Sequence, residues 1–599
     1  MADNETTPLM AQTSGRHPYV DEDEQKGPKR IAAAFFVIAA ETFERLAWYS
    51  VSGTLFAYLT KQPLCLSDSH ASAVQFMFNA VTYTCCLLGG VISDSYISRH
   101  VTIIIGYILY YLGYILLGIM SKYDDMKDSR NSSSNTYEGI KCESNVSDGD
   151  WRLSVSLIVF ALFIISMAAA IVKTNLPPFG AQQVRMYGVT HSRRFMTWYF
   201  WGINLGALIA YSGFSMLEER RSFAFGYLIA FSVSLSLSFL LFLLGMKLYI
   251  KRLPESRFVV KDIFKVICNA QKVKRDNPDI KEEWLLEYSN MAKGYPGAEC
   301  TFQEIRDTKN ICQIFKVVLL MIPYWICYSH IIGNIYQLQG LHMSLGFPLR
   351  QPTIFPITNC TSRWQLLNST LCDSVTNATY LEGYTSSKDS PITAAVLAIF
   401  DNIFILVFLP FAHTFYKCLT ARNFVIYTYR RLVTGMIIAS LSILAAGAIE
   451  TVRLQNICEL GVQVQFIDFT YYLAAPSLNI LWQTIQYCLA GASEILFTAT
   501  GLEYAYIKSP VHMQGLSMGL FWFSIGIGNF IGLALTSIFQ VTNRINCGFL
   551  DVYFYALAFF LGICTFIFYK CSTYFHLGLH RMIILPLPPE ERQVFSTNS

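Results

Sequence analysis

Long apolar runs set the strongest limit on what this chain can fold into. In lipid every backbone N–H and C=O group needs a hydrogen-bond partner within the spanning segment, which an α-helix provides. A helix of about 20 apolar residues crosses the ~30 Å of hydrocarbon in a bilayer. The sequence therefore predicts an all-α membrane protein with twelve transmembrane helices, near 31–60, 72–97, 101–120, 152–178, 195–216, 224–248, 312–340, 391–416, 431–453, 479–507, 513–540 and 551–576.

Composition supports this class and excludes others. Of the 599 residues, 53% are hydrophobic and only 14% are charged, whereas a soluble chain of this length would carry more charge on the surfaces of several domains. The net charge of +4 reflects lysines and arginines beside the spans, so it predicts no nucleic-acid partner. The polar first thirty residues predict no cleavable signal peptide.

The distribution of lysine and arginine predicts the orientation. The connection after span four carries Arg185, Arg193 and Arg194 without an acid, and the one after span eight is also basic. The connection 121–151 instead has seven acids against four lysines and arginines. Because positive residues collect on the cytosolic side, both termini are expected in the cytosol.

Glycosylation sequons follow the same division. Asn131 and Asn145 lie in the third connection, and Asn359, Asn368 and Asn377 lie in the seventh. Both connections are predicted to face the lumen or the extracellular space, where asparagine can be glycosylated.

Cysteines indicate disulfides on that side. Six of the sixteen fall in predicted lumenal segments, which permits up to three disulfides. The six are Cys65, Cys142, Cys360, Cys372, Cys458 and Cys547. We expect Cys360 to pair with Cys372, because a short loop can close locally. The sequence contains no CxxC pair with metal-ligand spacing, so we expect no metal site.

The longest cytosolic connection divides the spans into six and six. This plan resembles that of the major facilitator superfamily, in which two six-helix bundles rock about a midplane cavity. The expected regions are a cytosolic tail 1–29, a bundle 30–248, a linker 249–311 with amphipathic helices, a bundle 312–576 and a cytosolic tail 577–599.

Charged residues interrupt the first span. Glu41, Glu44 and Arg45 are spaced i, i+3 and i+4, and Tyr49 follows one turn later, so they share one helical face. A charged face is costly in lipid, so this one is expected to face a cavity. The alternative interpretation is a structural ion pair of Arg45 with Glu44 or Glu41 that only locks the bundles.

Ionisable residues inside other spans complete a chemical pattern. Lys173 adds a second cation in the N-terminal half, whereas Asp401 and Glu494 place anions in the C-terminal half, and His330 is titratable in span seven. A cavity with one cationic and one anionic wall suits a zwitterion such as an amino acid or a short peptide. Tyr49, Tyr83 and Trp325 are expected to line it.

Five sequence motifs resemble those of the proton-coupled oligopeptide transporters. "ETFERLAWYS" resembles ExxERFxYYG, and "GGVISDSYISRHVTI" resembles the family's connection after span two. "VKTNLPPFGAQQV" and "RFMTWYFWGINLGALI" are similar to the motifs of spans four and five, and "GASEILFTATGLEYAYIKSPVHMQG" to that of span ten. The resemblance extends from about Arg30 to Phe575.

The resemblance implies roles for particular residues. Glu41, Glu44, Lys173 and His330 would take part in proton coupling. Residues expected at the substrate are Arg45, Tyr49, Tyr83, Lys173, Asn204, Trp325, Asp401 and Glu494, with the basic ones at the peptide carboxylate and Glu494 at its amine. Asp94 and Arg99 would gate the cytosolic end. His330 and Asp401 depart from the family pattern, which has an acid and most often an asparagine at these two positions.

The closest branch in this resemblance is the peptide/histidine transporters of endosomes and lysosomes. The tail residues Glu5, Leu9 and Met10 form an acidic dileucine-like motif, which sorting adaptors would read. A lysosomal or late endosomal location is therefore expected, with the plasma membrane as the alternative.

The predicted function is proton-coupled symport of di- and tripeptides and histidine from an acidic lumen to the cytosol. Protons are the coupling ion, no cofactor is expected, and the sequence contains no catalytic triad or phosphate-binding loop, so we predict no enzyme. One alternative is a membrane scaffold whose conformation recruits a cytosolic adaptor protein. A facilitator of nitrate or other anions is another, which the presence of both Glu41 and Glu44 disfavours.

Overall fold

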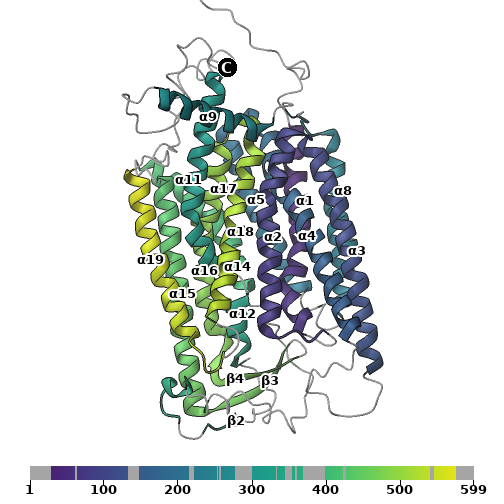
Figure 1. The fold of residues 1–599 in the computed structure, drawn as a ribbon, viewed down its shortest axis with the longest axis vertical. Helices are drawn as coiled ribbons and strands as arrows, with labels where there is room; N and C mark the ends of the chain where they lie inside the picture. Colours follow the sequence, from purple (N-terminus) through teal and green to yellow (C-terminus); the bar gives the residue numbers. More distant parts are fainter. Residues whose placement is uncertain are drawn as a thin grey trace, which may run out of the picture.

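The computed structural model shows long helices running side by side (Figure 1). Helix α9 lies across one end and short strands lie at the other, and we call these the α9 end and the sheet end. The structure describes residues 28–60, 64–131, 148–214, 217, 222–252, 254, 258–276, 300–331, 334–344, 354–357, 360–367, 371, 398–422, 427–467, 470–539 and 545–574.

Each of the first six predicted spans corresponds to helical structure. The elements are α1 (Pro28–Thr60), α2 (Asp68–Ser95), α3 (Arg99–Asn131), α4 (Asp148–Gln183), η2 (Arg185–Tyr187), α5 (Val189–Ile209), η3 (Ala210–Phe214), α7 (Phe223–Ile229), η4 (Ala230–Leu235), α8 (Ser236–Leu244) and η5 (Gly245–Lys247). Segments η3 and η4 are π-helical, so spans five and six each contain a local widening of the helix.

The last six predicted spans are also helical. The elements are α11 (Phe302–Ile331), α12 (Asn334–Leu341), η8 (Arg363–Leu367), α14 (Ile399–Ala421), α15 (Thr428–Leu460), η11 (Ile480–Gln483), α16 (Thr484–Leu496), α17 (Thr498–Lys508), η12 (Val511–Met513), α18 (Gln514–Ile538) and α19 (Leu550–Tyr574). Helix α11 begins inside the predicted linker. The predicted span starts later, near residue 312, because the first turns of this helix are polar.

The predicted all-α membrane class is confirmed. Among the described residues, eight helical segments are long and apolar enough to cross a membrane. Helix α1 is absent from that set, although it has 33 residues, because its charged residues lower its hydropathy.

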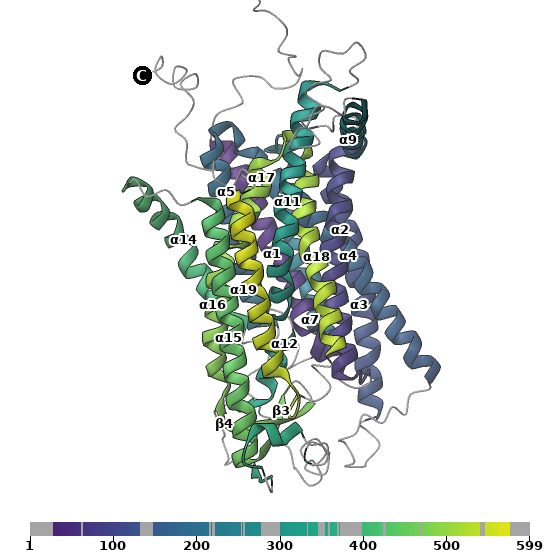
Figure 2. The same ribbon diagram turned by 60° about the vertical axis from the view of Figure 1, so that its left-hand side comes forward.

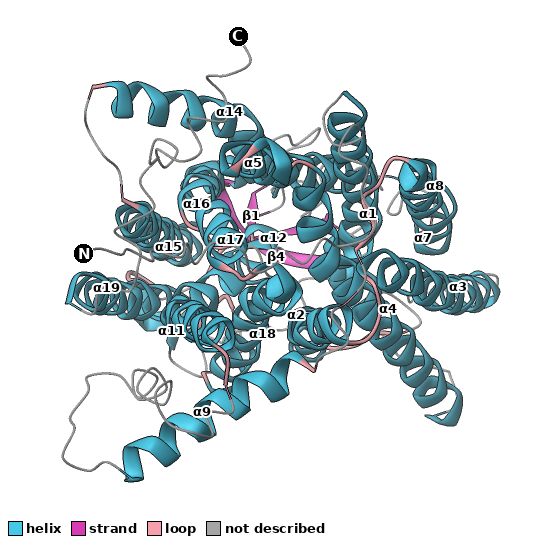
Figure 3. Cartoon of the chain, turned by 90° about the horizontal axis from the view of Figure 1, so that it is seen from above, coloured by secondary structure: helices cyan, strands magenta, loops and turns pink. Residues whose placement is uncertain are grey.

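The two halves meet where helices pack closely. Viewed from above, the helices of 28–247 and those of 302–574 form two groups that touch along α2 with α18 and along α5 with α14 (Figure 3). Glycines make the first contact possible. A Cβ atom on Gly519 would lie 2.8 Å from the Cys86 carbonyl oxygen, and one on Gly90 would lie 2.1 Å from that of Gly515. Small residues let helix backbones approach in this way.

Helix α9 (Val259–Asp276) forms over the first predicted amphipathic stretch of the linker. Val259, Val266 and Ala270 lie on its buried face. The helix packs against α2 of the first half and α11 of the second (Figure 2). The second predicted amphipathic stretch, 281–294, lies outside the described residues.

The sheet end contains strands that the sequence did not predict. Strands β1 (Met343–Ser344), β2 (Ile354–Phe355), β3 (Val462–Ile467) and β4 (Thr470–Asn479) form a sheet in the order β1-β4-β3-β2. Strands β2, β3 and β4 pair antiparallel, and β1 is parallel to β4. All four come from connections within the C-terminal half.

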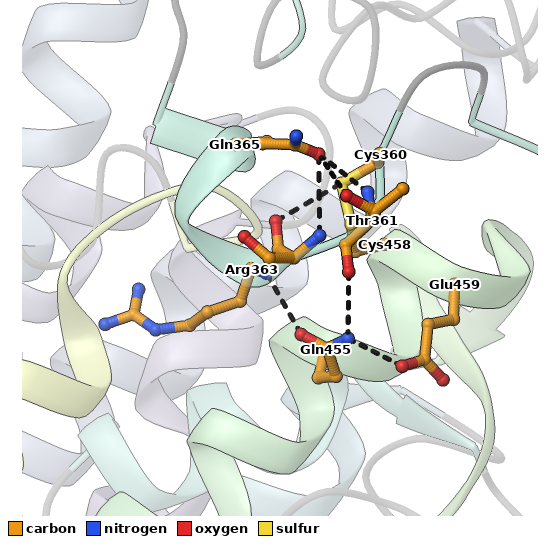
Figure 4. Close-up of a disulfide and its surroundings, with 8 residues drawn as sticks. Cys360, Thr361, Arg363, Gln365, Gln455, Cys458 and Glu459 are labelled. Atoms are coloured by element: carbon orange, nitrogen blue, oxygen red, sulfur yellow. Dashed lines mark hydrogen bonds between the residues drawn. A yellow bond between two sulfur atoms is a disulfide. The ribbon is translucent and has the colours of Figure 1, made fainter.

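The expected pairing of Cys360 with Cys372 is wrong. Cys360 forms a disulfide with Cys458, 98 residues away in the sequence (Figure 4). The end of α15 brings the two Cα atoms to 5.2 Å, and Arg363 N–H donates to Gln455 of the same helix at 3.0 Å. A guess based on loop length missed this because helix packing, and not sequence separation, brings the two cysteines together.

The remaining cysteines follow the predicted division. Cys65 and Cys547 are disulfide-bonded as well. Ten cysteines of the described residues are free, and they lie in the helices or toward the α9 end: Cys85, Cys86, Cys268, Cys300, Cys312, Cys327, Cys418, Cys488, Cys564 and Cys571.

Candidate functional site

The charges of α1 are buried inside the N-terminal half. Glu41, Glu44 and Arg45 have no exposed surface. Arg45 Nη2 donates to Glu44 Oε1 at 2.6 Å, and its Nε contacts Glu44 and lies 3.3 Å from Glu41 Oε1. The Tyr110 hydroxyl donates to Glu44 Oε1 at 2.5 Å, and Tyr199 faces Glu41. One guanidinium thus faces two carboxylates, which leaves this cluster able to hold one proton.

Lys173 of α4 is held by aromatic rings. Its Nζ lies 4.2 Å from the ring centre of Tyr83, 4.4 Å from that of Trp522 and 5.3 Å from that of Trp48. It also donates to the Tyr83 hydroxyl at 3.0 Å. Trp522 belongs to α18, so a ring from the opposite half covers this cation. Cation–π contacts stabilise a desolvated ammonium group without neutralising its charge.

Two carboxyl groups lie together in the C-terminal half. Asp401 of α14 and Glu494 of α16 are each 4% exposed and within hydrogen-bonding reach of each other. The Tyr328 hydroxyl of α11 donates to Glu494 Oε1 at 2.7 Å. Among the described residues neither carboxyl forms an ion pair, so this wall of the site is anionic.

A cavity of about 70 Å³ lies between the halves. Its lining is polar and aromatic but contains no charged side chain. The lining residues are Trp48, Tyr49, Ser52, Gly53, Gln75, Asn79, Tyr83, Tyr211, Tyr328, Ser329, Gln337, Ala398, Tyr487, Ile525 and Asn529. The predicted lining residues Tyr49 and Tyr83 are therefore at the cavity.

The two charged walls are joined through this lining. Tyr49 and Tyr83 each interact electrostatically with Arg45 of the first half and with Glu494 of the second. Tyr83 also accepts the Lys173 hydrogen bond, and Tyr328 reaches Glu494 from the other side. A ligand in the cavity would thus have a cation, Lys173, behind Tyr83, and a carboxyl, Glu494, behind Tyr328.

The predicted gate residues Asp94 and Arg99 join the two halves at the α9 end. Arg99 and Asp94 form an ion pair at 2.8 Å. Asp94 Oδ2 accepts a hydrogen bond from the Leu516 backbone N–H at 2.8 Å, and Arg99 donates to Gln514 at 3.1 Å. Because Leu516 and Gln514 belong to α18, both predicted gate residues link the first half to the second.

A second ionic link joins the halves at the same end. Glu503 of α17 lies 3.1 Å from Arg193 of α5 and 3.5 Å from Arg431 of α15. Arg193 is in the N-terminal half and the other two are in the C-terminal half, so this carboxylate bridges the two.

Three more predicted site residues, His330, Trp325 and Asn204, lie outside the cavity lining, as the charged ones do. His330 is 1% exposed, and its nitrogens face the Ile326 carbonyl and the Tyr553 hydroxyl, both at 2.7 Å. Trp325 is buried against Gly528 of α18, because Tyr328, one turn later, occupies the cavity side. Asn204 donates to the Phe200 carbonyl of its own helix at 2.9 Å.

Several predictions cannot be placed in the structure. The sorting residues Glu5, Leu9 and Met10 lie outside the described residues, as do the sequons at Asn145, Asn359, Asn368 and Asn377. Asn131 is the last residue of α3, and its side chain is also outside the description. These sites stay predictions.

Sequence reasoning missed the uncharged partners of the charges. Tyr110, Tyr199, Trp48, Trp522 and Tyr328 each contact a predicted site residue. The signal in the sequence is weak, because an aromatic residue in an apolar helix normally packs against lipid or core. Only the helix arrangement selects these five from the 88 aromatic residues, comprising 44 Phe, 35 Tyr and 9 Trp.

The sequence matches a known family over most of its length. The family model described as "PTR2: POT family" matches residues 100–359 and 374–549, which is more than half of the chain. The chain belongs to the POT family. The predicted resemblance to the proton-coupled oligopeptide transporters is therefore confirmed.

Relatives of this POT family member cover nearly its whole length. "Solute carrier family 15 member 3" of Mus musculus is 28% identical over 552 residues, covering 89% of this chain and 90% of the relative. The crystal structure of an auto-inhibited POT family peptide transporter aligns with a TM-score of 0.60 at 16% identity, over 92% of this chain and 98% of that one. A POT family transporter in complex with a thioalcohol-conjugated peptide aligns with a TM-score of 0.57 at 14% identity, over 90% and 96%.

Family membership settles the broad class of this POT protein. It is a multi-pass membrane transporter and not an enzyme, as the sequence predicts. Among the described residues no group of three or more histidines, cysteines, aspartates or glutamates is arranged to hold a metal ion.

Proposed function

We propose that this POT family member is a proton-coupled symporter of di- and tripeptides and histidine. It moves them by alternating access from the acidic lumen of lysosomes or late endosomes to the cytosol. The observation that carries the proposal is the pair of oppositely charged walls about one cavity, with Arg45 and Lys173 in one half and Asp401 and Glu494 in the other. Arg45 and Lys173 receive the substrate carboxylate, and Glu494 receives its amine.

Proton coupling rests on the α1 cluster. Arg45 can neutralise one carboxylate, while Glu41 and Glu44 supply two. A substrate carboxylate that competes for Arg45 leaves a carboxylate of the cluster without its cation, which favours protonation. Substrate and proton then bind with a coupling free energy, which is the thermodynamic basis of symport. His330 is the further titratable group proposed to take part, although it lies behind the cavity wall.

The proposed orientation places the α9 end in the cytosol and the sheet end in the lumen. Two observations support it. The disulfide Cys360–Cys458 lies at the sheet end, and disulfides persist in oxidising compartments. Arginines such as Arg193 and Arg431 collect at the α9 end, in agreement with the positive-inside rule. Glycosylation of the sequons in the third and seventh connections and sorting by adaptors at Glu5, Leu9 and Met10 belong to the same proposal, with the plasma membrane as the alternative location.

Two other functions are less well supported. A scaffold that recruits a cytosolic adaptor protein is not favoured, because the family model matches residues 100–359 and 374–549 and similar solved structures are those of POT family transporters. A facilitator of inorganic anions would have no use for the carboxyl pair of the C-terminal half.

Uptake into proteoliposomes tests this function. With an imposed inward proton gradient, we expect accumulation of a labelled dipeptide and of labelled histidine, which a protonophore abolishes. Glu44→Gln is expected to lose accumulation while it keeps exchange of labelled for unlabelled substrate, because exchange needs no net proton movement.

Glu459→Gln is the matched control, since it removes an exposed carboxylate at the sheet end that bonds Gln455. It should transport like the unmodified protein. Proton-driven accumulation at full rate by Glu44→Gln would refute the coupling role, and an absence of uptake of both substrates by the unmodified protein would refute the function.

A further inference from the structure

Asp401 and Glu494 lie together in a buried site that does not accommodate two negative charges. The two side chains are buried and lie within hydrogen-bonding reach of each other. Helix packing fixes this contact. A Cβ atom on Gly491, one turn before Glu494, would lie 2.9 Å from Asp401 Oδ1, so the backbones of α14 and α16 touch at this level.

The surroundings of the pair supply no positive charge. Tyr328 donates to Glu494, and the other titratable groups that interact with either carboxyl are Tyr49, Tyr83, Tyr211, Tyr324, Tyr487 and Cys488. Within the described residues, Arg45 is bonded to Glu44 and Lys173 to Tyr83. Two buried carboxylates in contact without a cation repel strongly, and one of them takes up a proton.

One oxygen of the pair lacks a hydrogen-bond donor. Among the described residues no N–H or O–H group donates to Asp401 Oδ1, and the residue is only 4% exposed. An unpartnered buried acceptor is costly unless a ligand or a proton satisfies it. Tyr487 of α16 and Ala398, directly before α14, line the cavity, and so does Tyr328, which donates to Glu494 from α11, so the pair lies behind this part of the lining.

We propose that Asp401 and Glu494 form a second proton-binding site, which shares one proton between the two carboxyls while the cavity is empty. The singly protonated pair has a net charge of −1, which the ammonium group of one substrate molecule neutralises. No bond other than the hydrogen bond changes in this step, and the proton stays on the pair when the ammonium binds. The identity of the ligand rests on the proposed transport function. The presence of the shared proton does not.

Infrared difference spectroscopy of the purified, ligand-free full chain tests the proton directly. We expect the carbonyl band of a protonated carboxyl at neutral pH in the unmodified protein. Asp401→Asn should remove the part of this band that the pair contributes, since it replaces one carboxyl by an amide of the same shape. Glu494→Gln removes the partner and should remove the same part of the band, so it serves if Asp401→Asn does not fold.

Controls separate this result from other carboxyls and from transport. Glu503→Gln removes a carboxylate that lies between two arginines and should leave the band unchanged. Addition of a dipeptide should shift the band, whereas the same dipeptide with an acetylated amine should not. A band of undiminished intensity in both Asp401→Asn and Glu494→Gln, or no such band in the unmodified protein, overturns the proposal. The ligand-free spectrum needs no transport, so failure of the proposed function would show separately, as absent uptake.

Discussion

Arg45 holds the N-terminal part of the site together. Its guanidinium contacts both carboxylates of α1 in a fully buried position. Removal of one partner from a buried ion pair costs about 3–5 kcal/mol, because it leaves an uncompensated charge. Loss of Arg45 would therefore destabilise the whole protein and say little about coupling. A milder change at the edge of the cluster is more informative.

Tyr110→Phe is such a change. It removes the hydroxyl that donates to Glu44 Oε1 and keeps the ring. A hydrogen bond to a charged group contributes about 1.5–3 kcal/mol, so we expect a loss of thermal stability of this order. Because this donor reaches the cluster proposed to carry the proton, the pH midpoint of proton-driven uptake should differ from that of the unmodified protein.

Tyr107→Phe provides the comparison. Tyr107 is also a fully buried tyrosine of α3, but its hydroxyl bonds Ser238 at 2.7 Å and does not contact Glu44. This variant should lose some stability and keep the pH midpoint of uptake. Equal midpoints in the two variants would contradict the role of Tyr110.

His342 makes the sheet end sensitive to acid. It lies just beyond α12, donates from Nδ1 to the Leu473 carbonyl of β4 at 2.8 Å, and is buried. Burial, together with the positive charge of Arg453, lowers the pKa of His342 to about 3. The unfolded chain binds a proton at this residue below about pH 6.5 and the folded chain does not, so stability falls as the pH drops from 6.5 towards 3.

Unfolding measured against pH tests this. We expect a loss of about 2 kcal/mol between pH 7 and pH 5 from this residue, at about 1.4 kcal/mol per pH unit. His342→Asn retains a donor for the Leu473 carbonyl and should remove that part of the acid-dependent loss. His191→Asn is the control, because His191 contacts a carbonyl at 2.8 Å but is exposed. An unchanged pH dependence in His342→Asn would contradict the assignment.

At the scale of elements, α2 and α18 form the tightest junction between the halves. A Cβ atom on Gly519 would meet the backbone of α2 at 2.8 Å from the Cys86 oxygen and 2.9 Å from Leu87 Cα. The backbone of a packed helix cannot move away from an added Cβ atom, whereas a flexible side chain can change its rotamer. Glycine is therefore needed at this junction because it leaves room for the backbone of α2, and not because of its conformational freedom.

Gly519→Ala should weaken this junction. Overpacking of a close contact costs about 1–3 kcal/mol, which exceeds the gain in helix propensity from alanine. Thermal unfolding of the purified protein should show a lower midpoint. Gly562→Ala in α19 is the matched control, since a Cβ atom there meets nothing within 4 Å, and its midpoint should stay equal or rise. A lower midpoint in both variants would show that the contact is not the cause.

The elements also show what the sequence could predict. Spans such as α4 were predictable because length and apolar content are local properties of the chain. The shared face of Glu41, Glu44 and Arg45 followed from helical periodicity alone. The disulfide Cys360–Cys458, the strands β1 to β4 and the cover of Lys173 by Trp522 depend on contacts between distant segments. Residue spacing in the sequence does not indicate these contacts, because they form only when the helices pack together.

At the scale of the whole molecule, ionic and hydrogen-bonded links join the two halves at the α9 end. Asp94 and Arg99 link α2 to α18, and Glu503 links α5 to α15 and α17. In an alternating-access cycle these links must break before a ligand can leave at that end. Their strength therefore contributes to the balance between the two conformations.

Glu503→Gln should shift this balance. A partly exposed ion pair contributes up to about 1 kcal/mol, which corresponds to roughly a fivefold change in the ratio of closed to open molecules. Spin labels on exposed residues at the α9 ends of α3 and α15 would report it as a larger fraction of long distances. Asp276→Asn disrupts an exposed pair on α9 and should leave the distances unchanged. An unchanged distribution of spin-label distances in Glu503→Gln would contradict the inference that this ionic link holds the two halves together.

The sheet gives the two halves unequal ends. All four strands, together with the disulfide from Cys360 to Cys458, belong to the C-terminal half, so the plate they form is anchored to α12, α15 and α16. An antibody fragment raised against this plate would be carried by one half only. It would thus serve as a fiducial marker for single-particle imaging, in which the displacement of the marker relative to α3 and α4 measures how far the halves have turned.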